Sequence, residues 1–242
     1  MTISETILGY AASNGGAVTR ENLLPWFEST WPDASARSID NELRKMVLAG
    51  KLERTGRGQF RTCPDAKPPY IPAISTEMKE LFLKISRIYP YLGLCIWQVR
   101  ALSSFMQHVP NIDMIMIEAG KDASEAIYED VRELASGRTA LLRPTEKECR
   151  LYASGTPSVI VRDLISEAPV ISVDGVASAS LEKILVDAII APEFEFARGA
   201  ELYTIYENAG QMYHIGKKTM LRYASRRGKR EEIEELIEMT MP

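Results

Sequence analysis

Residues 34–61, ASARSIDNELRKMVLAGKLERTGRGQFR, decide the fold expected for the first part of the chain. Apolar side chains recur there at helical spacing, which predicts an amphipathic helix with one apolar stripe. The stripe consists of Ile39, Leu43, Met46 and Val47. Asp33 is the expected N-cap of this helix, and Gly50 ends it.

A hairpin is predicted directly after the helix. Residues 51–55 and 59–62 alternate in a strand-like way about a glycine-flanked arginine at residues 56–58. Leu52 and Phe60 would then face the core.

Two further helices are expected upstream, at residues 4–13 and 20–29, with a turn at residues 14–16 between them. Three helices followed by a hairpin are typical of a winged helix-turn-helix. We therefore expect a DNA-binding domain of this type over residues 1–62.

The polar face of the helix and the hairpin carry side chains that contact DNA in such domains. Arg, Lys and Ser bind phosphates, Arg and Asn read base edges, and a glycine-flanked Arg can enter a minor groove. The candidate DNA-binding residues are Arg37, Ser38, Asn41, Arg44, Lys45, Arg54, Arg57 and Arg61. A solvated helix face is the alternative interpretation.

Charge supports this local interpretation. Residues 34–62 contain seven Lys or Arg and three Asp or Glu, a local net charge of +4, whereas the whole chain has a net charge of −4. A net acidic chain does not bind polyanions generally, so contact with nucleic acid would depend on this basic patch and on salt.

Composition narrows the class of protein further. The 242 residues are 45% hydrophobic, and no apolar run approaches the length of a membrane span. The N-terminus lacks the pattern of a signal peptide. Cys63, Cys95 and Cys149 are widely spaced, which argues against a zinc site or a disulfide framework and favours a reducing cytoplasm.

A domain boundary is expected at residues 63–73, where four prolines fall within nine residues and predict a stiff linker. Beyond it, helix-like and strand-like segments alternate, which predicts an α/β domain over residues 74–242 that ends in a helical cap. The overall class expected is therefore α/β (α+β). The expected helices are residues 76–87, 99–108, 123–135, 180–190, 196–209, 217–225 and 229–239. The expected strands are residues 92–97, 112–118, 138–142 and 158–164.

Catalytic and cofactor signatures are absent from the sequence. His108 and His214 have no partners at ligand spacing, and no phosphate-binding glycine motif occurs, so we expect no metal, no cofactor and no enzymatic activity. One weak alternative is a nuclease of the restriction type, in which Asp113, Glu118 and Lys121 would hold a metal. The spacing disfavours it, and we expect Glu118 to end a buried strand and Asp122 to cap the next helix.

A second basic cluster lies near the C-terminus. It consists of Lys217, Lys218, Arg222, Arg226, Arg227, Lys229 and Arg230. A glutamate-rich segment follows, so these charges are expected either to pair along the last helices or to form a second surface for DNA, RNA or an acidic partner.

Several short motifs of the second domain carry a resemblance. They are Cys95-Ile96-Trp97, Phe105-Met106-Gln107-His108-Val109-Pro110, Ile117-Glu118 with Lys121-Asp122-Ala123, Ser166-Glu167-Ala168-Pro169, Asp174-Gly175-Val176, Leu181-Glu182-Lys183-Ile184-Leu185-Val186-Asp187, and Leu221-Arg222-Tyr223-Ala224 with Arg226-Arg227. Over residues 80–230 the chain resembles an uncharacterised bacterial branch allied to the AbiEi-type antitoxins of type IV abortive-infection systems. The chain departs from that pattern at Ser103-Ser104 and at Ala119-Gly120, where the family tends to have Asn-Glu and a second acid.

The resemblance implies a transcriptional repressor of its own operon, acting as monomer or homodimer. It also implies opposition to a nucleotidyltransferase-like toxin without a stable complex. The alternative left open is a DNA-docked adaptor whose second domain binds a protein or a small effector.

Overall fold

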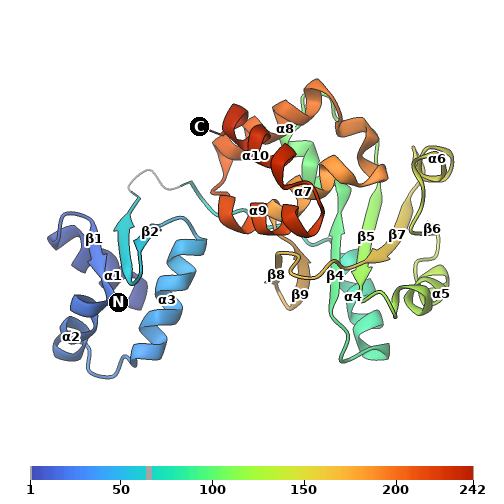
Figure 1. Ribbon diagram of the computed structural model, residues 1–242. Helices are drawn as coiled ribbons and strands as arrows, with labels where there is room; N and C mark the ends of the chain where they lie inside the picture. The colour runs from blue at the N-terminus through green and yellow to red at the C-terminus, as the bar shows by residue number, and fades with distance from the viewer. Residues whose placement is uncertain (1, 64–66, 242) are drawn as a thin grey trace. The chain divides into compact units, whose positions relative to one another are not determined.

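The structure is a computed structural model that describes residues 2–63 and 67–241. The chain is mixed α/β, as the sequence predicts. It forms two compact units, Met1–Pro69 with Met212–Ile215, and Tyr70–Gln211 with Gly216–Pro242 (Figure 1). The predicted linker spans this division; its residues 64–66 lie outside the described residues, and residues 70–75 form neither helix nor strand.

The first unit contains three helices and a small antiparallel sheet. In chain order its elements are α1 (Ile3–Ser13), β1 (Ala17–Thr19), α2 (Arg20–Thr30), α3 (Ala36–Leu48), β2 (Leu52–Gly56) and β3 (Gln59–Thr62). The sheet order is β1-β3-β2. The three helices and the hairpin match the predicted ranges closely. The short strand β1, which pairs with β3, was not predicted.

The apolar stripe of α3 packs into the core of this unit. Ile39, Leu43 and Met46 are buried against α1 and α2, while Val47 lies at the edge. The predicted cap of this helix is wrong, because the N-cap is Ser35, whose Oγ accepts a hydrogen bond from the Ser38 amide at 3.1 Å. Ser35 directly precedes the first helical residue, whereas Asp33 lies two residues further out.

The second unit is built around a four-stranded sheet. Its elements up to the end of this sheet are α4 (Thr76–Ile88), β4 (Leu94–Gln98), η1 (Val99–Phe105), β5 (Met114–Ala119), α5 (Ser124–Leu134), β6 (Thr139–Leu142), α6 (Glu146–Glu148), η2 (Cys149–Ala153) and β7 (Ser158–Asp163). The strand order is β4-β5-β7-β6, with β4 antiparallel to β5 and the remaining pairs parallel.

The rest of the unit begins with a hairpin and continues as helices. The elements are β8 (Val170–Val173), β9 (Val176–Ala179), α7 (Leu181–Ile190), η3 (Pro192–Ala197), α8 (Ala200–Met212), α9 (Lys217–Arg226) and α10 (Arg230–Thr240). The second unit differs from the prediction in several details. Residues 99–105 form a 3₁₀ helix, α8 starts only at Ala200, and neither the short helices α6 and η2 nor the β8–β9 hairpin was anticipated.

The two faces of the four-stranded sheet differ in chemistry. One face carries Ile96, Ile115, Ile117 and Val161 and packs in an apolar core against α4 and α5. The strand register places Cys95 beside Glu118, Trp97 beside Met116 and Glu118 beside Arg162 on the other face. Charged side chains of β5 and β7 therefore project on the side where Lys183 of α7 meets Glu118.

Candidate nucleic-acid interface and buried charge cluster

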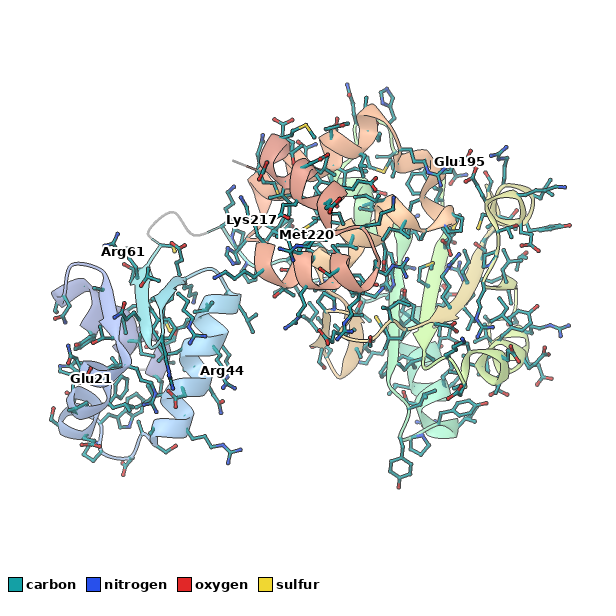
Figure 2. All side chains as sticks on the ribbon, in the orientation of Figure 1. Glu21, Arg44, Arg61, Glu195, Lys217 and Met220 are labelled. Atoms are coloured by element: carbon teal, nitrogen blue, oxygen red, sulfur yellow. The ribbon has the colours of Figure 1, made fainter. Side chains whose placement is uncertain are left out.

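The exposed face of α3 gathers the helix residues predicted to contact DNA. Arg37, Ser38, Asn41, Arg44 and Lys45 are all exposed. Figure 2 shows Arg44 on the side of α3 that points away from α1 and α2. Because the opposite side of α3 is fixed in the core, the helix presents these side chains as one continuous polar surface.

Two acidic residues adjoin this surface. Asp40 receives a bidentate pair from Arg20 at 2.7 and 2.9 Å, and the hydrogen bond from Arg20 keeps the pKa of Asp40 below its ordinary value. Glu42 lies 3.3 Å from the Lys45 ammonium. Asp40 is thus neutralised by a cation outside the candidate set, whereas Glu42 pairs with Lys45 of the set. Among the described residues, Arg37 and Arg44 therefore carry the unpaired positive charge of the face.

The hairpin arginines do not share one side of the sheet. Arg54 pairs across the strands with Phe60, and Arg61 pairs with Glu53, so that Arg54 and Arg61 lie on opposite faces. Arg54 also donates from Nε to the Gly56 carbonyl oxygen at 3.1 Å. Arg57 lies exposed in the turn between the strands. Arg54 and Arg61 of the predicted wing therefore project from different sides of the hairpin, because the register alternates the two strand residues.

The second basic cluster is divided by the structure. Arg222 and Arg226 both pair with Glu167, Lys229 pairs with Glu232, and Arg230 lies 3.6 Å from Glu234. Lys217 donates to the Met241 carbonyl oxygen, and Lys218 is exposed. Arg227 does not belong to this surface, since it follows α9 and turns inward to lie 3.6 Å from Asp187 with a side chain only 17% exposed. Ion pairs within the protein therefore neutralise much of the positive charge at this surface.

The acid, acid and lysine set considered for a nuclease is not assembled. Asp113 accepts hydrogen bonds from Arg138, and Lys121 is exposed. Glu118 is buried within β5 and pairs elsewhere. The predicted cap at Asp122 is also wrong, because the residue before α5 is Ala123 and makes no side-chain cap.

A buried cluster of charges instead surrounds Lys183, which the sequence interpretation did not single out. Its Nζ lies 2.7 and 2.6 Å from the two Glu118 oxygens and 2.5 Å from Asp187 Oδ2. The Tyr223 hydroxyl donates to Asp187 Oδ1 at 2.9 Å. The ammonium also lies 5.3 Å from the centre of the Trp97 ring. Lys183 is fully buried, and its charge is held by two carboxylates and an aromatic face.

Burial and pairing act in opposite directions on these groups. Burial alone would lower the pKa of Lys183, but Asp187 and Glu118 outweigh it and raise that pKa well above its ordinary value. Burial raises the pKa of Glu118 although Lys183 opposes the change. Burial likewise raises the pKa of Glu193, which is paired with Arg162. Pairing therefore favours the charged form of Lys183, whereas burial favours the protonated forms of Glu118 and Glu193.

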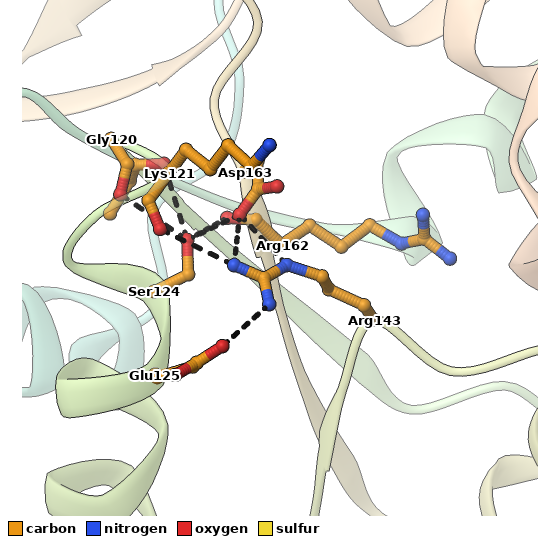
Figure 3. A network of polar contacts seen from close by, with 8 residues as sticks. Gly120, Lys121, Ser124, Glu125, Arg143, Arg162 and Asp163 are labelled. Carbon is orange, nitrogen blue, oxygen red and sulfur yellow. Dashed lines mark hydrogen bonds and ion pairs between the residues drawn. The ribbon is translucent and has the colours of Figure 1, made fainter.

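A cavity of about 150 Å³ opens beside this cluster. Trp97, Met116, Glu118, Arg143, Arg162, Asp163, Ile165, Asp187, Ala191, Phe194 and Arg227 line it. Figure 3 shows part of its wall, where the Arg143 guanidinium lies between Asp163 and Glu125. Asp163 Oδ1 accepts from Arg143 at 2.7 Å and from Ser124 at 2.7 Å. The Arg143 backbone has a positive φ of 44°, which an L residue adopts at a cost, so this pair holds a strained position.

Potential metal ligands and thiols are present in the described part of the chain. No group of three or more His, Cys, Asp or Glu side chains is placed there to hold a metal ion. The exposed His108 ring lies 3.4 Å from Glu201. The three cysteines are free, and burial raises the pKa of Cys149 to about 12. None of the described helices is both long and apolar enough to cross a membrane.

Comparison with protein families identifies one match. A model described as "Family of unknown function (DUF6577)" matches residues 38–242. The chain belongs to this family. The DUF6577 match includes all of the second unit's helices and strands, together with α3 from Ser38 onward and the β2–β3 hairpin. No curated protein matches the chain.

Proposed function

We propose that the first unit is a winged helix that binds double-stranded DNA, and that this DUF6577 protein regulates transcription. The order α1-β1-α2-α3-β2-β3 and the antiparallel sheet β1-β3-β2 support the proposal, because they are typical of winged helix-turn-helix domains. In such domains the third helix enters the major groove and the hairpin contacts the flanking backbone.

The polar face of α3 is the observation that carries this proposal. Arg44 and Lys45 are exposed beside Asn41, and the helix that holds them is fixed by its buried stripe. Arg reads guanine, Asn reads adenine and Lys binds phosphate when a helix lies in the groove. Arg57 at the tip of the hairpin is the proposed minor-groove or phosphate contact, with Arg54 and Arg61 on either side of the sheet.

The resemblance to AbiEi-type antitoxins supplies the biological setting of the proposal. The protein would repress its own operon in the cytoplasm and oppose a nucleotidyltransferase-like toxin without a stable complex or a catalytic step. A single winged helix commonly gains affinity from a second copy on an inverted repeat, so a homodimer on the operator is compatible with this setting.

A DNA-docked adaptor with an effector-binding second unit is the second candidate. The polar cavity beside Lys183 is the observation that favours it. The neighbouring genes discriminate the two candidates: an adjacent toxin-like reading frame favours the antitoxin, and its absence favours the adaptor.

The test of DNA binding is the double variant Arg44→Ala/Lys45→Ala in a mobility shift on DNA from upstream of the protein's own gene. We expect a loss of a few kcal/mol of binding free energy, at about 1–3 kcal/mol for each good base contact. Both side chains are exposed, so the free energy of unfolding should change by no more than about 0.5 kcal/mol.

The matched control is Lys84→Ala/Arg87→Ala, which removes the same two charges from exposed positions of α4. It should leave the shift unchanged. Equal effects of the two double variants would mean that net charge, rather than the α3 face, controls binding, and an unaltered shift with the α3 variant would refute the assignment of this helix.

A further inference from the structure

The cavity beside the buried charge cluster is lined by hydrogen-bond donors that have no acceptor and by carboxylates that are paired with cations of the protein. Glu118 Oε1 accepts a hydrogen bond from Lys183, and Glu118 Oε2 lies 2.6 Å from the same ammonium as an ion pair without a hydrogen bond of its own. Asp187 accepts from Lys183 and Tyr223. Asp163 accepts from Arg143 and Ser124. The acidic side chains of the wall therefore have their principal partners within the protein.

The donors are in a different state. Trp97 is 1% exposed, and within the described chain its Nε1–H has no acceptor. Arg227 Nε is also buried and, in the described part of the chain, has no hydrogen-bond acceptor, because Asp187 lies 3.6 Å away. Arg162 donates to Glu193 and to the Pro144 carbonyl oxygen, and a guanidinium has more N–H groups than these two bonds use. A buried donor without an acceptor costs free energy, so an acceptor that entered the cavity would remove this cost.

The remainder of the wall is apolar. Met116, Ile165, Ala191 and Phe194 line the cavity, and the Phe194 ring stacks on Trp97 with centroids 5.8 Å apart. Inorganic phosphate would leave these surfaces without a partner. The volume of about 150 Å³ is close to that of an engineered apolar cavity, roughly 150 Å³, that holds benzene.

We propose that this cavity binds a small organic carboxylate, whose carboxylate accepts from Arg227, Arg162 and Trp97 and whose apolar part contacts Phe194 and Met116. The site lies entirely in the second unit. Its existence does not depend on DNA binding, so either proposal can fail while the other stands.

Isothermal titration of the full chain with benzoate tests the proposal, with the neutral isostere benzamide and with inorganic phosphate as the other arms. We expect benzoate to bind and benzamide to bind at least about tenfold more weakly, because only the carboxylate forms charge-assisted hydrogen bonds. Phosphate binding alone would overturn the assignment of an organic ligand. Absence of benzoate binding up to about 10 mM would overturn the proposal as a whole.

Two variants locate the binding site. Arg227→Gln should weaken benzoate binding about tenfold or more, whereas Arg222→Gln, on the exposed side of α9, should not change it. Since Arg227 also adjoins Asp187, Ala191→Leu provides an independent variant that fills the cavity without altering charge. It should abolish benzoate binding while circular dichroism remains that of the folded protein. Benzoate affinity unchanged in both Arg227→Gln and Ala191→Leu would refute this site.

Discussion

Arg44 on α3 and Lys183 on α7 are cations placed in opposite surroundings. Arg44 is exposed on a helix whose other side fills the core of the first unit, and it is available to an external phosphate or base. Lys183 is fully buried, and its ammonium is enclosed by Glu118 and Asp187. Water solvates an unpaired surface charge at little cost, whereas a buried charge without partners is expensive. The same charge is therefore accessible from outside in the first unit and enclosed within the fold in the second.

The largest expected effect comes from removing the buried cation. Lys183→Met should lower the free energy of unfolding by about 3–5 kcal/mol, because it leaves Glu118 and Asp187 as uncompensated buried acids. Urea denaturation of the variant and of Lys84→Met, an exposed position on α4, provides the measurement. In the control, Lys84→Met, the free energy of unfolding should change by no more than about 0.5 kcal/mol. A similarly small loss of unfolding free energy in both variants would mean that the buried ammonium of Lys183 does not contribute to stability.

A smaller effect should appear in the pH dependence of stability. Burial raises the pKa of Glu118 above its ordinary value of 4.5, so the folded state binds a proton more tightly than the unfolded state. The stability that this group contributes is therefore complete below pH 4.5 and is lost as the pH rises through the folded pKa. Glu118→Gln removes this titration. Relative to the unsubstituted protein, the variant should gain stability with rising pH, by up to about 1.4 kcal/mol for each unit of pKa difference.

Denaturation at about pH 5 and about pH 8 measures this difference. Glu80→Gln on α4 is the control, since Glu80 is exposed. Its stability relative to the unsubstituted protein should not vary between the two pH values. If the free energy of unfolding of Glu118→Gln, relative to the unsubstituted protein, stayed constant or fell between the two pH values, the raised pKa of Glu118 would be contradicted.

Local spacing predicted the exposed cation but not the buried one. The stripe of Ile39, Leu43 and Met46 defines both the core side of α3 and, by exclusion, its polar side. The interaction of Lys183 with Glu118 depends instead on which face of β5 meets which turn of α7, and 65 residues separate the pair. A signal existed in the sequence: Lys183 and Asp187 lie four residues apart in a helix whose other residues, apart from Glu182, are apolar, and charges are rare in such a helix unless they are paired.

The other differences have similar physical causes. Strand β1 is three residues long and exists because β3 pairs with it, which no local pattern reports. The β8–β9 hairpin did have a local signal, since Asp174 and Gly175 both adopt positive φ and Asp-Gly favours that turn. Arg227 was grouped with its neighbours by charge, yet it follows the last residue of α9 and turns inward. Side-chain direction at a helix end follows from tertiary packing, which charge in the sequence does not encode.

The smallest expected effect concerns Arg57, the exposed arginine in the turn between β2 and β3. Under the proposed function, Arg57→Ala should reduce the slope of log affinity against log salt by about 0.9, the value for one phosphate contact on duplex DNA. Sequence preference and stability should not change, because the side chain neither packs in the core nor reads a base in this role.

Titrations at several salt concentrations measure the slope, with Arg132→Ala, an exposed residue of α5, as the control for loss of one charge. An unchanged slope would place the hairpin off the DNA, whereas a changed sequence preference would mean that Arg57 reads the minor groove. Either result would leave the contrast between Arg44 and Lys183 intact, because that contrast depends on burial and not on the hairpin.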